Sequence, residues 1–407
     1  MKKHSFTLNI LGVIAFTLTS WNCAEDPIET DLLHYSLSID TLTIGNLSGT
    51  PYWIAPNLGK TNNLYFGKKN DLDAFISFIE FPSYYNWEGF LDSTNTFDSL
   101  HFVVYSNDSL LMSESMPTLH FSPDSQFSED KSSYLDYSDF STSSTSEWTS
   151  IGLPEIKIEE DTSGNFMHAE LIWDIISLFE TLTDTSDSNL VRTFALKPIN
   201  DDSTFFEIYS REGHQTKNPK IMTYFRRTIQ LENDSTLIDT VVSPLGASAD
   251  VSIINPGDSY QNSLNIGVSS GFGLRSLLSI PFDSLSLPNG TLIRSAHLSI
   301  PLDSATIIND YLIIIDPLES ELDTLINYFE TDPYISIGYP YSILKDTENG
   351  LFELSLKSYL QNIIIGNVSN IGFKIIPSDQ NDPFEKIHFN MSDTENPPVI
   401  EIIYVSN

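Results

Sequence analysis

The sequence predicts an all-β protein made of two tandem antiparallel β-sandwiches, each with one short helix. Short runs rich in Ile, Leu, Phe, Tyr and Val, such as "AFISFIEF", "LHFVVYS" and "DYLIIID", alternate with turns of Ser, Asp, Asn and Gly. This spacing is typical of a sandwich. Helical periodicity is scarce, and two long stretches of the chain repeat each other. These observations together indicate two β domains of one kind.

The N-terminus predicts export. Residues 1–22 combine a basic start with an apolar run too short to span a membrane, as in a secretory signal peptide. Cys23 is the only cysteine and follows directly, which resembles the lipobox of a bacterial lipoprotein of the Bacteroidota type. We therefore expect Cys23 to be lipidated and residues 23–29 to form a short tether. The alternative is an ordinary signal peptide with an incidental cysteine.

The clearest repeat joins Phe194–Phe225 to Phe373–Tyr404 without a gap, at a constant offset of 179 (373 − 194). Apolar and proline positions stay in register throughout. Further upstream, Asn63–Phe81 parallels Ser263–Phe282, and His101 corresponds to His297. The repeat therefore predicts one sandwich over residues 30–227 and a second over residues 228–407.

Three segments interrupt the strand pattern. Residues 122–150 are crowded with Ser, Thr and Asp, and we expect a loop-like insertion whose composition supports no core. Asn165–Leu182 places Leu171, Ile175 and Phe179 on one helical face, which predicts a helix. Its counterpart, Leu351–Ile365, predicts the helix of the second sandwich.

Composition narrows the classes of partner. The 407 residues carry a net charge of −35 with only 20 Lys and Arg, which argues against binding nucleic acid or anionic lipid headgroups. Any membrane attachment is then through the N-terminal lipid alone, at the outer membrane or cell surface. With one cysteine, no intrachain disulfide is available, so packed cores must hold the fold.

The second repeat resembles the DNRLRE domain, which is similar to carbohydrate-binding module family ninety-six. The likeness rests on "LNIG" at Leu264–Gly267, "RSLL" at Arg275–Leu278, "FD" at Phe282-Asp283 and "SAHL" at Ser295–Leu298. The first repeat keeps the family's closing Ser-x-Glu loop as "SRE", whereas the second has "FNM" there. The resemblance implies a jelly-roll-type sandwich and, for some members, polysaccharide binding.

Catalytic and metal motifs are weak, so we expect no enzyme activity. "GVSSG" around Ser269 matches the nucleophile elbow in letters, but it lies between antiparallel-type strands rather than before a helix. The scattered histidines lack zinc-ligand spacing. Acidic turns at Asp71–Asp73 and Asp379–Asp382 offer oxygens that calcium accepts, although a solvated turn explains them equally. Calcium is therefore possible as a cofactor and is not established.

Aromatic loops provide the best candidates for a binding site. Exposed rings stack on sugar faces, and the candidates for this role are Tyr52, Trp53, Tyr84, Tyr85 and Trp87. Arg211 and Glu212 of the first repeat's "SREGH" loop are candidates for hydrogen bonds to sugar hydroxyls. The alternatives are rings that cap the core and an Arg–Glu pair that bonds only to itself.

Two functions follow from these expectations. The first is a non-catalytic surface lipoprotein that binds or retains polysaccharide, more readily a neutral glycan than an anionic one because the chain is so acidic. The second is a structural or adhesive cell-surface protein whose sandwiches dock other proteins.

Overall fold

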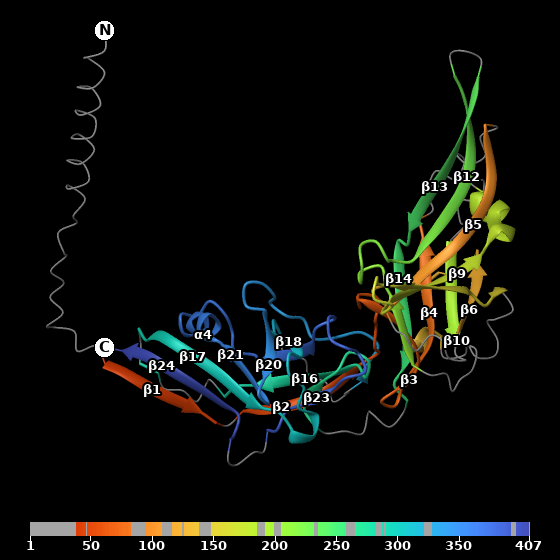
Figure 1. Ribbon diagram of the computed structural model, residues 1–407. Coiled ribbons are helices and arrows are strands. Elements are labelled where there is room, and N and C mark those ends of the chain that lie inside the picture. The colour runs from red at the N-terminus through yellow and green to blue at the C-terminus, as the bar shows by residue number, and fades with distance from the viewer. Residues whose placement is uncertain are drawn as a thin grey trace, which may run out of the picture.

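The computed structural model describes residues 38–45, 47–82, 94–107, 116–123, 126–137, 148–184, 192–198, 205–231, 235–257, 265–281, 287–288, 290–320, 328–391 and 396–406. Within these residues the chain is mostly antiparallel strand with a few short helices, which confirms the predicted all-β fold class. The strands gather into two lobes set at an angle to each other (Figure 1). In the part of the chain that the structure describes, no helix has the length and apolarity to cross a membrane.

The first lobe, called the first unit below, is a sandwich of two sheets. One sheet has the order β11-β3-β4-β10-β6-β7 with β14 added on β4, and the other has the order β13-β12-β5-β9-β8. Its elements are β3 (Asn63–Lys69), β4 (Leu72–Phe81), β5 (Asn95–Ser106), β6 (Pro117–Ser122), α2 (Tyr134–Tyr137), β7 (Thr149–Gly152), β8 (Glu155–Glu160), β9 (Phe166–Asp174), η5 (Ile176–Leu178), α3 (Phe179–Thr183), β10 (Arg192–Pro198), β11 (Phe206–Tyr209), β12 (Lys220–Gln230), β13 (Thr236–Gly246) and β14 (Ala249–Asn255).

The core of the first unit lies between these two sheets. Phe81 and Phe194 come from one sheet, Phe102 and Trp173 from the other, and all four side chains are at most 1% exposed. The ring of Phe102 meets that of Phe81 edge to face at 5.8 Å between centroids. Interdigitated rings of this kind add to the stabilisation that comes from buried apolar area alone.

The second unit is built around one long sheet of order β1-β24-β17-β21-β20-β18-β22-β16-β2-β19, beside the small pair β15-β23. The two halves of that sheet enclose a single core, and β20 joins them by pairing with both β21 and β18. Its elements are β1 (Ser38–Ile44), β2 (Ser48–Ile54), β15 (Gly267–Val268), β16 (Leu274–Ser279), β17 (Leu292–Pro301), η8 (Ser304–Thr306), β18 (Leu312–Pro317), β19 (Tyr328–Phe329), β20 (Ile343–Glu348), β21 (Leu351–Ser355), α4 (Lys357–Ile364), β22 (Phe373–Pro377), β23 (Ile387–His388) and β24 (Val399–Ser406).

The repeated strands occupy equivalent places in the two units. β10 lies between β4 and β6, and β22 lies between β16 and β18. The strand register matches as well. The corresponding residues His101 and His297 pair with Met222 and Glu401, and these two partners are also 179 residues apart (401 − 222). The offset seen in the sequence is therefore a true structural repeat.

The units exchange their first two strands. β1 and β2 precede the first unit in the chain but pair with β24 and β16 of the second unit. β13 and β14 open the second repeat but pair with β12 and β4 of the first unit. The exchanged strands pair in the same register in both units. Ile44 pairs with Ile400 and Leu245 pairs with Ile221, and these two partners are 179 residues apart (400 − 221).

This exchange moves the boundary between the units away from the one that the repeat predicts. Residue 227 lies in the middle of β12, not between domains. β12 continues directly into β13 as a long antiparallel hairpin, which holds β13 and β14 on the first unit. The equivalent place in the second unit is then filled by β1 and β2. In space the first unit spans residues 63–255, and the second combines residues 38–54 with 267–406.

The two units meet through a small apolar cluster. Trp53, Phe272 and Phe384 of the second unit pack with Tyr65 and Leu72 of the first. A Lys69–Asp382 ion pair of 2.7 Å and a hydrogen bond of 2.8 Å between the hydroxyls of Tyr134 and Tyr328 flank this contact. The junction therefore has its own core and is more than a flexible connection.

The predicted helices are shorter than expected. Asn165–Leu182 begins as strand β9, and only residues 176–183 are helical. β9 pairs on both sides, with β5 and β8, so sheet pairing overrides the helical spacing. Likewise Leu351–Ile365 divides into strand β21 and helix α4.

The insertion at residues 122–150 was also expected to lack a core, and its described residues show otherwise. The rings of Phe127, Tyr137 and Trp148 surround Phe78 on the outer face of the seven-stranded sheet, at 4.7–5.8 Å between centroids. Serine side chains help to fold the segment, since the Ser132 hydroxyl accepts a hydrogen bond from the backbone N–H of Ser128. A few aromatic residues are enough to anchor a Ser-rich segment on an existing sheet.

Candidate functional site

The residues predicted to bind ligand separate into three groups. Cys23, Tyr84, Tyr85 and Trp87 lie outside the described residues. Tyr52 and Trp53 lie on strand β2, at 1% and 3% exposure. Arg211 and Glu212 lie in the turn after β11, where they meet other charged side chains.

Tyr52 and Trp53 do not form the expected sugar-stacking platform. Alternation along β2 sends Tyr52 to one face of the sheet and Trp53 to the other, and both faces are covered. Tyr52 packs edge-on against Tyr334, with ring centroids 4.8 Å apart, while Trp53 belongs to the cluster between the units. Both rings are structural because Tyr334 of the same unit packs over Tyr52, whereas the first unit covers Trp53.

The turn after β11 is fixed by its backbone. The Ser210 hydroxyl donates to the carbonyl oxygen of Thr61 at 2.6 Å, and the backbone N–H of Ser210 donates to the carbonyl oxygen of Asn62. A Cβ on Gly213 would lie 1.9 Å from the same Asn62 oxygen, so only glycine fits there. The turn thereby holds the side chains of Arg211 and Glu212 in a defined place.

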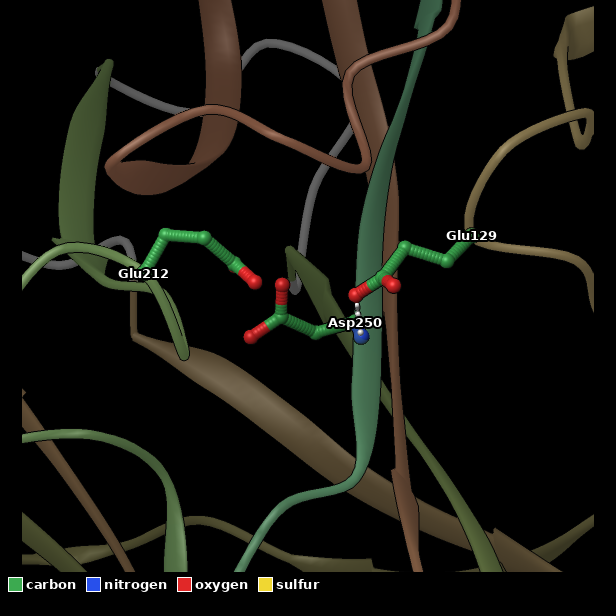
Figure 2. A group of neighbouring side chains, drawn as sticks. All are labelled: Glu129, Glu212 and Asp250. Carbon is green, nitrogen blue, oxygen red and sulfur yellow. Dashed lines mark hydrogen bonds between the residues drawn. The ribbon is translucent and has the colours of Figure 1, made fainter.

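Three carboxyl groups converge at this turn. Figure 2 shows Glu212, Glu129 from the folded insertion and Asp250 from β14 directed toward one another. One oxygen from each lies within 4.8 Å of the other two. The Arg211 guanidinium donates to both Glu129 oxygens at 3.0 and 3.1 Å and also pairs with Glu212. The expected Arg211–Glu212 pair exists, but inside a larger cluster.

Asp250 is the buried member of this carboxylate cluster. The residue is 1% exposed, and its Oδ2 accepts a hydrogen bond of 2.7 Å from the backbone N–H of Arg211. Its Oδ1 has no hydrogen-bond partner in the part of the chain that the structure describes. Burial raises the pKa of Asp250 to about 8, and burial also raises the pKa of Glu212. The guanidinium of Arg211 thus pairs with the two glutamates, whereas Asp250 bonds only to the Arg211 backbone.

The carboxylate cluster is confined to the first unit. The strand register places Gly49 of β2 where β14 has Asp250, because both pair with equivalent residues of β16 and β4. At the offset of 179, Asn390 and Met391 stand where the first unit has Arg211 and Glu212. The two units therefore differ in charge at this turn.

A polar pocket of about 280 Å³ opens at the junction of the units. The connection between β2 and β3, the folded insertion and three loops of the second unit line it. Its charged and hydrogen-bonding side chains are Asn57, Lys60, Asp130, Lys131, Ser269, Ser270, Arg275, Glu330, Thr331, Asp332 and Asp379. Among the described residues, no aromatic side chain lines it. Three cations and four carboxylates line the pocket, so it has no strong charge of one sign.

The floor of the junction pocket is a charge network around Asp332. Its carboxylate pairs with Arg275 and, at 3.2 Å, with Lys374, and it accepts a hydrogen bond from the Tyr52 hydroxyl. Burial, followed by the negative charge of Asp332, raises the pKa of Tyr52, which keeps this phenol a donor. By contrast, the buried hydroxyl oxygen of Ser270 has no hydrogen-bond partner among the described residues.

The remaining motif candidates have structural roles in the described residues. Ser269 is fully buried, donates to the carbonyl oxygen of Glu385 at 2.8 Å and is followed by a strand, so it is no nucleophile elbow. Asp382 bonds to Lys69 and to the backbone N–H of Phe384. Neither acidic turn that was considered for calcium gathers three carboxyl groups among the described residues.

Comparison of the chain with protein-family models, with curated proteins and with solved structures gives no match.

Several site residues escaped the sequence analysis. Asp250 and Glu129 lie far from Arg211 in the chain and are joined only by the strand exchange and the folded insertion. Arg275 did carry a signal: a cation inside the apolar run "GLRSLLS" requires a buried carboxylate partner. The sequence does not reveal which of the 55 acidic residues is that partner.

Proposed function

We propose that this chain is a non-catalytic, lipid-anchored surface protein that binds polysaccharide, and that the junction pocket holds one neutral sugar residue. The observation that carries the proposal is the pocket itself: about 280 Å³, lined mostly by polar side chains, and formed by both units. Ligand sites are frequent at domain interfaces, and this volume lies at the small end of their range.

The lining favours a hydroxyl-rich ligand. Carboxylates accept hydrogen bonds from sugar hydroxyls, whereas Arg275, Lys60 and the free Ser270 hydroxyl can donate to them. The mixed charges disfavour a polyanion, as does the net charge of −35. This assignment agrees with the likeness of the second repeat to the DNRLRE domain, and Cys23 would supply the anchor at the outer membrane or cell surface.

Calorimetry on the soluble chain, without residues 1–23, tests the proposal against a panel of neutral and acidic glycans. A neutral glycan should bind, and Ser270→Ala should weaken binding about 2- to 10-fold by removing one hydrogen bond. Ser270→Leu, which places a bulky apolar side chain at the pocket lining, should abolish binding. Ser358→Ala, an exposed serine on α4, is the matched control and should bind normally.

Two outcomes contradict the proposal. One is that no glycan binds, and the other is that a glycan binds equally to Ser270→Leu. Release of reducing ends from any bound glycan would contradict the non-catalytic part separately.

A structural or adhesive role is the second candidate, and the strand exchange favours it. Each unit is completed by strands from the other repeat, and an apolar cluster joins them. Such an interlocked pair suits a stiff spacer at a cell surface. Absence of glycan binding together with capture of a defined surface protein would favour this role.

A further inference from the structure

The carboxylate cluster of Glu129, Glu212 and Asp250 is separate from the junction pocket and has no part in the proposed function. It joins three segments that are distant in the chain: the folded insertion, the turn after β11 and strand β14. Arg211 binds the two glutamates and offers its backbone N–H to Asp250. The remaining polar contact is the Asp250 backbone N–H, which donates to Glu129 at 3.3 Å.

Charge in this cluster is unbalanced whenever all three carboxyl groups are ionised, because one guanidinium then leaves two negative charges uncompensated. Burial, which raises the pKa of Asp250 to about 8, keeps this carboxyl largely protonated at neutral pH, and a bound cation would stabilise its ionised form. Acidic clusters on a surface are common and are satisfied by water. Here Asp250 is 1% exposed, so water cannot serve it in the same way.

A second, independent observation points to a missing ligand. The Oδ1 atom of Asp250 is buried and meets no hydrogen-bond partner among the described residues, although its carboxyl group is directed at Glu212 (Figure 2). An acceptor in this state costs about 1–3 kcal/mol, or more when it is charged. Something that the chain itself does not provide is expected to meet this oxygen.

We infer that Glu129, Glu212 and Asp250 bind a hard divalent cation of the calcium type. All the available donors are oxygens, which calcium prefers at 2.3–2.6 Å, so two ligands on opposite sides of the ion lie about 4.6–5.2 Å apart. The separations of up to 4.8 Å among the three carboxylate oxygens fit this span. Two positive charges would balance the cluster.

The Arg211 bonds are compatible with the cation. Each carboxylate oxygen has two lone-pair directions, so a glutamate oxygen that accepts from the guanidinium can still bind an ion. The bound cation would fasten the insertion, through Glu129, to β14. The second unit has Gly49, Asn390 and Met391 at the equivalent positions and so should bind no cation there.

Calorimetric titration and thermal unfolding of the soluble chain, first stripped with a chelator, test the inference with CaCl₂ and MgCl₂ as probes. Calcium should bind one site and raise Tm, more so than magnesium. Asp250→Asn keeps the shape of the side chain and removes a buried charge, so the variant should fold. Its calcium affinity should fall about tenfold or more.

Glu212→Gln should weaken calcium binding in the same way, while Asp346→Asn, an exposed carboxylate on β20, should leave it unchanged. The inference is overturned if neither cation gives heat or a Tm shift at millimolar concentration. It is also overturned if Asp250→Asn binds calcium as the unmodified chain does. Glycan binding plays no part in either readout.

Discussion

The strand exchange predicts which fragments of this chain can fold alone. Residues 55–257 contain a complete first unit, whereas residues 55–227 end inside β12 and lack β13 and β14. In the complete unit, Leu245, Val251, Ile253 and Ile254 are at most 6% exposed. At about 1.5–3 kcal/mol for each buried side chain, their loss removes about 6–12 kcal/mol.

That loss is comparable with the whole stability of a domain, about 5–15 kcal/mol. Fragment 55–257 should therefore unfold cooperatively in urea, and fragment 55–227 should be unfolded in water. Both fragments lose the contacts with the second unit, so the difference between them reports β13, β14 and the last three residues of β12. Far-UV circular dichroism and urea titration measure it.

Deleting residues 38–54 from the full chain is the reciprocal experiment. It should unfold the second unit and leave the first intact, since β1 and β2 belong to the second unit. The reasoning is refuted if fragment 55–227 unfolds at the same urea midpoint as fragment 55–257.

Three further predictions concern single side chains. Asp332→Ala leaves Arg275 and Lys374 without their mostly buried partner and should cost about 3–5 kcal/mol in urea unfolding; a loss under 1 kcal/mol would contradict the network. Gly213→Ala forces a Cβ against a backbone carbonyl 1.9 Å away and should destabilise the first unit by about 1–3 kcal/mol, and an unchanged urea midpoint would argue against the turn as described. Burial, and next the positive charge of a nearby lysine, lowers the pKa of His388 below its usual 6.5, so the folded state favours the neutral ring. The stabilisation from the neutral ring is complete above pH 6.5 and is lost as the pH falls through the folded pKa. His388→Gln should therefore remove this part of the pH dependence of the urea midpoint, measured from pH 7.5 to 5. An identical pH profile in the variant and the unmodified protein would contradict this prediction.

The fold was predictable because local patterns and repetition carry it. An alternating apolar run predicts a strand without any knowledge of the strand that it pairs with. The offset of 179 predicts that corresponding strands occupy equivalent positions in the two units. The exchange was not predictable in this way, because β2 and β14 are equivalent and each could pair in either unit. The long β12–β13 hairpin holds β14 on the first unit and so leaves the equivalent place in the second unit to β2. The length of this hairpin depends on tertiary pairing.

The site was less predictable than the fold. "SREGH" marked Arg211 and Glu212 as unusual, and they do meet in a charged cluster, but their partners Glu129 and Asp250 come from distant segments. Tyr52 and Trp53 resemble surface aromatics in a single sandwich. Only the second unit and the junction explain why both are buried.

The central claim is that a glycan binds between the two units, and a crystal structure of the complex with the tightest glycan from the panel tests it most directly. The account predicts a sugar residue in the junction pocket, with hydroxyl groups within hydrogen-bond distance of Ser270 and of Lys60 on the connection between β2 and β3. A glycan bound elsewhere, for example only at Tyr84–Trp87, with the junction pocket filled by water, would contradict it.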